Sequence, residues 1–162
     1  MNTQENYSIE AASFRIGEFA SHNFWILRDP GYKVASELHG LATSRKTGRT
    51  LPIGRIGDRL GFYEFIPGKD CISVNGTRLL AKCRDFKIMY RGGKADVLDR
   101  WYRAVDLLEF LNQKNIDYSP FGIFGFKVIN SNSAYRFFAQ AMEIEHYSFP
   151  GLWEPGINTR FA

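Results

Sequence analysis

The hydrophobic pattern of the first quarter of the chain is typical of strands, in segments bounded by turn-forming residues. Ala12 to Phe19 alternates as Phe14, Ile16 and Glu18, whereas Ser21 to Arg28 and Lys33 to Leu41 are rich in aromatic and branched residues. Alternation and enrichment in such side chains are both strand signals. The second and third segments flank Asp29-Pro30-Gly31-Tyr32, which predicts a turn. The pattern therefore predicts three antiparallel strands.

Two later segments, Leu60 to Ile66 and Lys87 to Tyr90, have the same strand-like character. A loop that carries Lys46-Thr47-Gly48 and Pro52 precedes them, and Val74-Asn75-Gly76-Thr77 predicts a turn between them. The sheet is therefore expected to contain about four to six strands.

The apolar spacing changes to that of a helix between Lys94 and Asn115. The apolar positions with this spacing are Val97, Leu98, Trp101, Ala104, Val105, Leu108 and Leu111. Acidic residues near the start and Lys114 near the end match the helix dipole. This segment is predicted to be the first of two main helices.

A second helix is predicted from about Asn130 to about Glu145. Its apolar stripe follows the spacing i, i+3, i+4, i+7, i+8: Ala134, Phe137, Phe138, Ala141 and Met142. The segment 149–162 carries two Pro-Gly pairs around Trp153, and is expected to be an irregular closing tail.

Strands that precede helices predict an α+β fold. With 162 residues, 44% of them hydrophobic and 15% aromatic, the chain is expected to form a single domain, 1–162. The apolar runs are too short to span a membrane, and the first residues lack a cleavable signal pattern. We expect a cytoplasmic protein, or one exported without a cleavable signal peptide.

Several common chemistries find little support in the sequence. The net charge of +4 comes from scattered Lys and Arg, with one cluster in a Gly- and Thr-containing loop, so nucleic-acid binding is not expected. Cys71 and Cys83 lack metal-ligand spacing, as do the three histidines, and no phosphate-binding motif occurs. We expect ordinary thiols, and no metal or cofactor.

The predicted hairpin carries two histidines. With a turn centred between Pro30 and Gly31, residues whose numbers sum to 61 face each other, which places His22 opposite His39. Glu37 lies two residues before His39 and so belongs to the same face of the strand. The alternative interpretation is that the histidines are ordinary polar strand residues.

The start of the second helix reads Asn130-Ser131-Asn132-Ser133. Asn and Ser are preferred N-cap residues, so the segment is explained by capping alone. The functional alternative is a nucleophile at a helix N-terminus, where backbone N–H groups stabilise an oxyanion and a histidine on the sheet is the base.

These motifs, in this order, resemble the circularly permuted papain-like amidases, peptidases and acyltransferases of the lecithin retinol acyltransferase type. The motifs are Ser21-His22-Asn23-Phe24, Glu37-Leu38-His39-Gly40 and Asn130-Ser131-Asn132-Ser133. They also look like a set of uncharacterised bacterial proteins with serine at the nucleophile position. Ser131 stands where the enzymes have cysteine, which is the departure from the family pattern.

The resemblance implies a hydrolase or acyltransferase that acts on an amide or ester. In the implied mechanism Ser131 attacks the carbonyl carbon, His22 is the base, and His39 or Glu37 orients His22. Asn132, with the backbone of Ser133 and the supporting Asn130, would stabilise the oxyanion, and Ser133 is the competing nucleophile. Two alternatives stay open: a catalytically inactive papain-like binding module, and an antitoxin-like interaction domain. The latter would use the aromatic tail, namely Phe149, Trp153 and Phe161.

Overall fold

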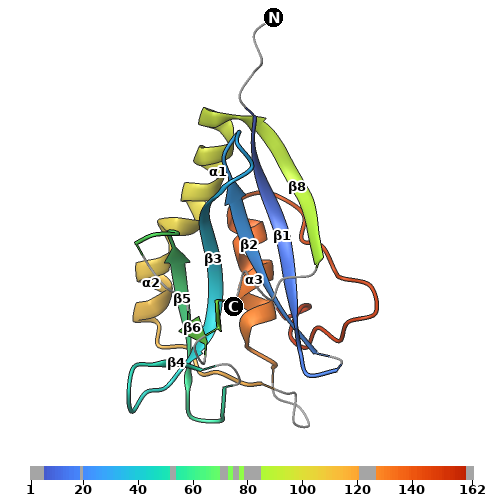
Figure 1. Ribbon diagram of the computed structural model, residues 1–162. Helices are drawn as coiled ribbons and strands as arrows, with labels where there is room; N and C mark the ends of the chain where they lie inside the picture. Colours follow the sequence, from blue (N-terminus) through green and yellow to red (C-terminus); the bar gives the residue numbers. More distant parts are fainter. Residues whose placement is uncertain are drawn as a thin grey trace, which may run out of the picture.

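The computed structural model describes residues 6–18, 20–51, 54–69, 73–74, 77–78, 85–120 and 127–159 (Figure 1). The strands are β1 (Asn6–Ile16), β2 (Ala20–Arg28), β3 (Val34–Thr43), β4 (Thr50–Leu51), β5 (Arg59–Phe65), β6 (Ser73–Val74), β7 (Thr77–Arg78) and β8 (Asp85–Gly93). The helices are α1 (Lys94–Val105), α2 (Leu108–Gln113) and α3 (Ser131–Ala141). The predicted α+β class is confirmed.

Six strands form one antiparallel sheet in the order β4-β3-β2-β1-β8, with β5 also paired to β3, while β6 and β7 form a separate pair. Strands β1, β2 and β3 pair with their neighbours in the chain, because short turns bring successive antiparallel strands together, whereas β8 pairs with the distant β1. The sheet agrees with the predicted four to six antiparallel strands.

The helices pack on one face of this sheet, and their apolar stripes supply the main core. The largest buried side chains of this core are Trp25, Phe62, Trp101, Tyr135, Phe138 and Met142. Trp25 stacks on Tyr135 with ring centroids 4.7 Å apart, and its indole N–H donates to the Tyr135 carbonyl at 2.8 Å. Burial of each such side chain contributes about 1.5–3 kcal/mol. We call this side of the sheet the helix face.

The opposite side, which we call the histidine face, carries the alternate residues of the same strands. Ala12, Phe24 and Ile26 are fully buried there and form a small apolar cluster of their own. Both faces of the central strands are therefore buried, which explains why β2 reads as an apolar run rather than as a strict alternation.

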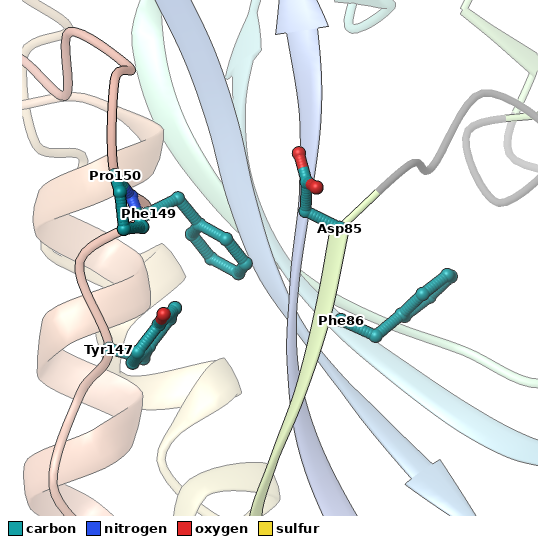
Figure 2. A pocket seen from close by; sticks show the side chains of 5 residues that line it. All are labelled: Asp85, Phe86, Tyr147, Phe149 and Pro150. Atoms are coloured by element: carbon teal, nitrogen blue, oxygen red, sulfur yellow. The ribbon is translucent and has the colours of Figure 1, made fainter.

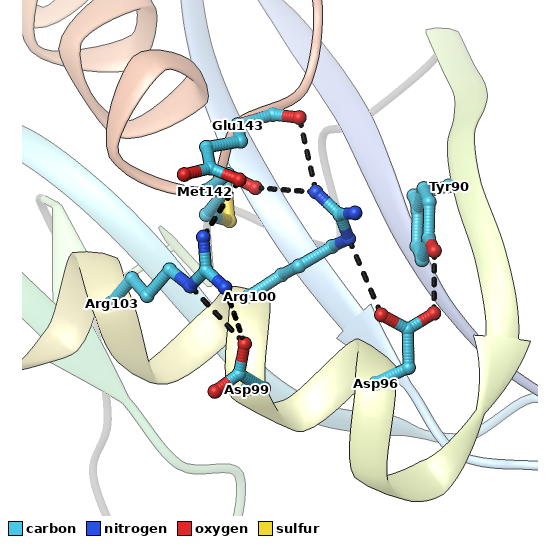
Figure 3. Close-up of polar contacts among 7 residues, drawn as sticks. All are labelled: Tyr90, Asp96, Asp99, Arg100, Arg103, Met142 and Glu143. Atoms are coloured by element: carbon cyan, nitrogen blue, oxygen red, sulfur yellow. Dashed lines mark hydrogen bonds and ion pairs between the residues drawn. The ribbon is translucent and has the colours of Figure 1, made fainter.

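The first predicted helix is interrupted, because the Leu107 N–H bonds to the Ala104 carbonyl three residues back and α2 begins at Leu108. The second ends earlier than the predicted Glu145, at Ala141, because Glu143 adopts a positive φ of 55°. Arg100 of α1 donates to the carbonyls of Met142 and Glu143 at 3.2 and 3.1 Å (Figure 3). This contact satisfies carbonyl groups at the end of α3.

The same side of α1 also holds β8 and the region after α3 through charged groups. Asp96 accepts from the Tyr90 hydroxyl at 2.5 Å, and the Arg100 guanidinium stacks 4.4 Å from the Tyr90 ring centroid. Arg103 pairs with Asp99 and with Glu143, each at 2.7 Å (Figure 3). The network connects three elements that meet at the same edge of the fold.

The hairpin between β2 and β3 differs from its predicted register. Trp25 pairs with Leu38, so facing residues sum to 63, with an irregularity between Leu27 and Arg28. The loop is one residue longer than predicted: Asp29 N–H donates to the Lys33 carbonyl at 3.0 Å, and Tyr32 takes a positive φ of 63°. The predicted opposition of His22 and His39 is therefore wrong by two positions.

The closing tail is irregular over residues 149–159, as predicted, and is tied to the sheet where Ser21 N–H donates to the Trp153 carbonyl at 3.2 Å. Cys71, Cys83, Phe161 and the centre of the predicted Asn75-Gly76 turn lie outside the described residues. None of the described helices has the length and apolar character needed to cross a bilayer.

Candidate functional site

The histidine face carries a continuous hydrogen-bonded chain of three side chains. His39 Nε2 lies 2.8 Å from Glu37 Oε2, and His39 Nδ1 lies 3.0 Å from His22 Nε2. A shift of two residues in register leaves every side chain on its own face, so the histidines meet although they are not directly opposed. The predicted sharing of one face by His22, His39 and Glu37 is confirmed.

Aromatic rings enclose this chain. Phe24 lies opposite His39 when the observed register is continued, and the two rings stack with centroids 4.3 Å apart. Phe14 pairs with His22 across β1 and β2, and Phe65 meets His39 edge-on at 5.6 Å. His39 is fully buried and His22 is 3% exposed. The two imidazoles are therefore held in fixed orientations in a largely dry environment.

Burial controls the ionisation of all three groups. It lowers the pKa of His39 to about 3, and together with the neighbouring His39 it lowers the pKa of His22 well below 6.5. The same effect raises the pKa of the Glu37 carboxyl to about 7, although the positive charge of Arg28 opposes the rise. Desolvation disfavours whichever form is charged, which is why acid and base shift in opposite directions. Both imidazoles are neutral at pH 7.

One imidazole nitrogen of the hydrogen-bonded chain has no partner among the described residues. A neutral imidazole has one donor and one acceptor nitrogen, and both nitrogens of His39 are used within the chain. Nδ1 of His22 makes no hydrogen bond to any residue in the described part of the protein. An ionised Glu37 would accept from His39, which would accept from His22, so that His22 Nδ1 carries a free lone pair.

Ser131 lies on the other side of the sheet. It is the first residue of α3, and its Cα is 3.6 Å from the point where a Cβ on Gly40 would sit. Successive strand residues point to opposite faces, so Gly40 faces α3 while His39 faces away from it. The hydroxyl of Ser131 is hydrogen-bonded to the phenol of Tyr118. The predicted contact between His22 and Ser131 is therefore wrong.

The remaining residues at the start of α3 are occupied by capping. Asn130 accepts from the backbone N–H groups of Asn132 and Ser133 at 2.9 and 3.4 Å, and the Ser133 hydroxyl accepts from the Asn130 N–H at 2.7 Å. This is a capping box, in which both side chains satisfy free helix donors. The predicted oxyanion donors are already paired, and the capping interpretation of Asn130 and Ser133 accounts for them.

The amide of Asn132 connects the helix start to β2 and the tail. It accepts from Asn23 N–H at 3.1 Å and donates to the carbonyls of Ser21 and Pro155 at 3.2 and 3.3 Å. At this end the β2 backbone bonds to Asn132 and to the tail, whereas the described β2–β3 ladder ends at Trp25–Leu38. The role of Asn132 is thus to hold the sheet to α3, rather than to bind an oxyanion.

Sequence reasoning missed two charged residues near the histidine chain. Arg28 at the end of β2 donates to Glu10 of β1 at 2.6 Å, and its charge acts on Glu37. Glu10 is 1% exposed, so this ion pair is largely buried. The alternation of side chains along strands could have identified them. Once β1 and β2 are aligned, residues 10, 22, 24, 26 and 28 all lie on one face of the sheet.

A separate pocket of about 400 Å³ lies between β8 and the segment that follows α3. Its walls are formed by Asp85, Phe86, Tyr147, Phe149 and Pro150 (Figure 2). Phe149 is nearly buried against the main core, whereas Trp153 is 53% exposed. The aromatic tail thus divides between core packing and surface, and none of the pocket residues contributes to the histidine chain.

Within the described residues, no group of three or more His, Cys, Asp or Glu side chains is arranged to hold a metal ion. The chain matches no protein-family model, and comparisons with curated proteins and with solved structures find no match. The papain-like relationship therefore stays a prediction, and the histidine chain has to be interpreted from its own geometry.

Proposed function

We propose that this protein is a hydrolase or acyltransferase acting on an amide or ester, with His22 as the general base. The observation that carries the proposal is the chain Glu37–His39–His22, at 2.8 and 3.0 Å, which ends at His22 Nδ1, a nitrogen without a hydrogen-bond partner among the described residues. A base oriented by a second group, which is itself held by a carboxylate, is the arrangement used in nucleophilic catalysis.

Burial sets the protonation state of the proposed base. An imidazole accepts a proton only in its neutral form, and burial keeps His22 neutral by lowering its pKa, which also makes it a weaker base than a free imidazole. Stacking on Phe24 and pairing with Phe14 fix the plane of the ring. His22 is thus prepared to remove a proton from a water molecule or from an acceptor hydroxyl on the substrate.

In the proposed reaction the attacking oxygen comes from water or an acceptor alcohol, rather than from Ser131. His22 Nδ1 takes the proton as the oxygen attacks the carbonyl carbon, and returns it to the leaving nitrogen or oxygen as the tetrahedral intermediate breaks down. Water gives hydrolysis, and an alcohol gives acyl transfer. His39 and Glu37 are positioning residues, because they act through His22.

The test is a comparison of matched variants on a panel of p-nitrophenyl esters and p-nitroanilides. His22→Ala is expected to lower kcat/KM about 10²- to 10⁴-fold, the usual contribution of a general base. Ser131→Ala is expected to stay within about twofold of the wild type, because Ser131 lies outside the proposed machinery. Circular dichroism of both variants controls for folding.

A fluorophosphonate probe separates the two possible nucleophiles. We expect no covalent adduct on the folded wild-type protein, as measured by intact mass. An adduct that Ser131→Ala removes would overturn the water mechanism and restore the serine. Turnover that His22→Ala leaves unchanged, or no turnover of any substrate in the panel, would count against His22 catalysis and favour the inactive binding module.

A further inference from the structure

We propose that Glu37, His39 and His22 form a proton relay, in which a proton taken up at His22 Nδ1 is stored on the Glu37 carboxylate rather than on an imidazole. This inference rests on the proposed function for the role of His22, and it adds where the proton goes. The relay would let the site change from a base to an acid without creating a buried imidazolium.

The geometry permits the transfer because each link is already a hydrogen bond. In the base form, His39 Nε2–H donates to Glu37 at 2.8 Å, and His22 Nε2–H donates to His39 Nδ1 at 3.0 Å. A proton arriving at His22 Nδ1 releases the proton on His22 Nε2 to His39 Nδ1. His39 in turn passes the proton on its Nε2 to Glu37.

The protons balance in this sequence. One proton enters at His22 Nδ1, two move along existing hydrogen bonds, and the carboxylate becomes a carboxyl group. Each ring begins with a proton on Nε2 and ends with one on Nδ1, so that neither gains charge. In the resulting acid form Glu37 donates to His39, His39 donates to His22, and His22 Nδ1–H is the donor to the leaving group.

The burial of the chain favours storage on the carboxyl group. His39 is fully buried and Glu37 is 6% exposed, so an uncharged chain avoids the desolvation cost of two opposite ions. The direction of the shifts agrees, since the pKa of Glu37 is raised to about 7 while that of His39 is lowered to about 3. The Ser-His-Asp triad differs here, because its carboxylate remains ionised during catalysis.

The other charged and titratable groups near this face come from β1, β2, β5 and β8, and from the β2–β3 loop, whose Tyr32 is hydrogen-bonded to Glu10 and feels the charge of Arg91 on β8. Arg28 of β2 lowers the pKa of Glu37, but its guanidinium is paired with Glu10 of β1, with N–O distance 2.6 Å. Tyr63 of β5 pairs with His39 in the strand register, and its hydroxyl is hydrogen-bonded to Thr43 at 2.7 Å. The Glu10–Arg28 pair thus limits how strongly Arg28 can hold Glu37 in its ionised form.

The experiment is ¹⁵N NMR of the imidazole nitrogens in the full chain between pH 5 and 8. His146→Gln serves as the background, since it removes the third histidine. We expect His22 and His39 to exchange Nε2–H for Nδ1–H together as the pH falls, with one midpoint near the Glu37 pKa of about 7. Neither ring should show the signature of two protonated nitrogens in this range.

Glu37→Gln is the matched variant, because it keeps the shape and cannot take up a proton. We expect it to abolish the tautomer change over this range. In the wild type, infrared difference spectra should also show a protonated carboxyl band that grows below pH 7 and is lost in Glu37→Gln. This measurement keeps the test valid if the NMR spectrum of the variant is broadened.

Imidazolium formation at His22 or His39 between pH 5 and 8, or a tautomer midpoint unchanged in Glu37→Gln, would overturn the relay. The result is independent of catalysis, because no substrate is present. Fixed tautomers with His22-dependent hydrolysis would remove the relay and leave the proposed function. A tautomer switch in a protein without turnover would support the relay and count against the proposed function.

Discussion

The two faces of the sheet are both buried, yet they are built on different chemistry. The helix face is an apolar core in which Trp25, Phe62 and Phe138 meet the helices, and its polar residues at the start of α3 are capped or tied to β2. The histidine face has a smaller apolar cluster around a polar chain, Glu37–His39–His22. Alternation along single strands separates one from the other.

This difference separates the source of stability from the site of the proposed reaction. Apolar contacts on the helix face stabilise the fold through burial, which is large and non-directional. A buried polar chain contributes little net stability, because its hydrogen bonds mainly offset the desolvation of its own groups. This chain ends at a ring nitrogen without a partner in the described part of the protein, and the proposed function gives that nitrogen a role.

The largest expected effect separates the faces by stability. Phe138→Ala should lower the free energy of unfolding by about 3–5 kcal/mol, since it opens a cavity in the main core. His39→Leu should cost about 1–3 kcal/mol, because it leaves Glu37 and His22 without their shared partner. Urea unfolding followed by fluorescence measures both. Equal losses would indicate that the histidine chain is chiefly structural.

The next effect concerns how closely α3 approaches β3. A Cβ on Gly40 would lie 2.2 Å from the Cβ of Ala134, so Gly40→Ala should cost about 1–3 kcal/mol through overpacking. Gly93→Ala is the control, since nothing lies within 4 Å of its added Cβ. Because Gly93 is the N-cap of α1, where Ala is less favourable than Gly, we expect the control to lose no more than about 1 kcal/mol in thermal unfolding. Equal stability of the two variants would contradict the close packing.

The smallest expected effect is a pH dependence of stability from the histidine face, measured in the His146→Gln background because burial lowers the pKa of His146 as well. Between pH 4.5 and 6.5, unfolded histidines bind protons that His22 and His39 in the fold do not, so acidification destabilises the protein. Glu37 acts in the opposite direction, because it stays protonated in the fold up to about pH 7 and is ionised when unfolded. Two histidines opposed by one carboxyl leave a net loss of stability on acidification, of at most about 1.4 kcal/mol per pH unit.

Two variants test how each group contributes to this pH dependence. Glu37→Gln removes the opposing group and should make the loss about twice as steep, whereas His39→Leu removes one histidine and should make the stability nearly constant in this range. Urea titrations at half-unit pH steps measure both slopes. Identical slopes in all three proteins would mean that the buried chain does not titrate on unfolding, which contradicts its assigned ionisation.

Much of the fold follows from local patterns. Most predicted strands and both helical regions are found near their predicted positions, since turns, apolar period and caps are properties of adjacent residues; the exception is β1, which begins at Asn6 rather than Ala12 and ends at Ile16. The break before Leu108 and the end at Ala141 were not predicted, because they depend on which backbone groups Ala104 and Arg100 meet. Element boundaries are set by such contacts as much as by propensity.

For the candidate site, the sequence by itself determined that His22, His39 and Glu37 share a face. The residue numbers of facing positions in the hairpin sum to 63 rather than the predicted 61. A shift of two residues keeps each side chain on its own face of the sheet, so the two histidines meet in either register. The order of the motifs also placed Ser131 at a helix start. These are one-dimensional properties of the chain.

Only the tertiary structure decided which side of the sheet α3 covers. A helix that follows a sheet can pack on either face, and the choice depends on where the larger apolar surface lies. Here the rings on the Trp25 side receive α3, and Gly40 allows the close approach that brings Ser131 to that side. Ser131 is thereby separated from His22 by the sheet itself, and the histidine chain is left with a terminal nitrogen of its own.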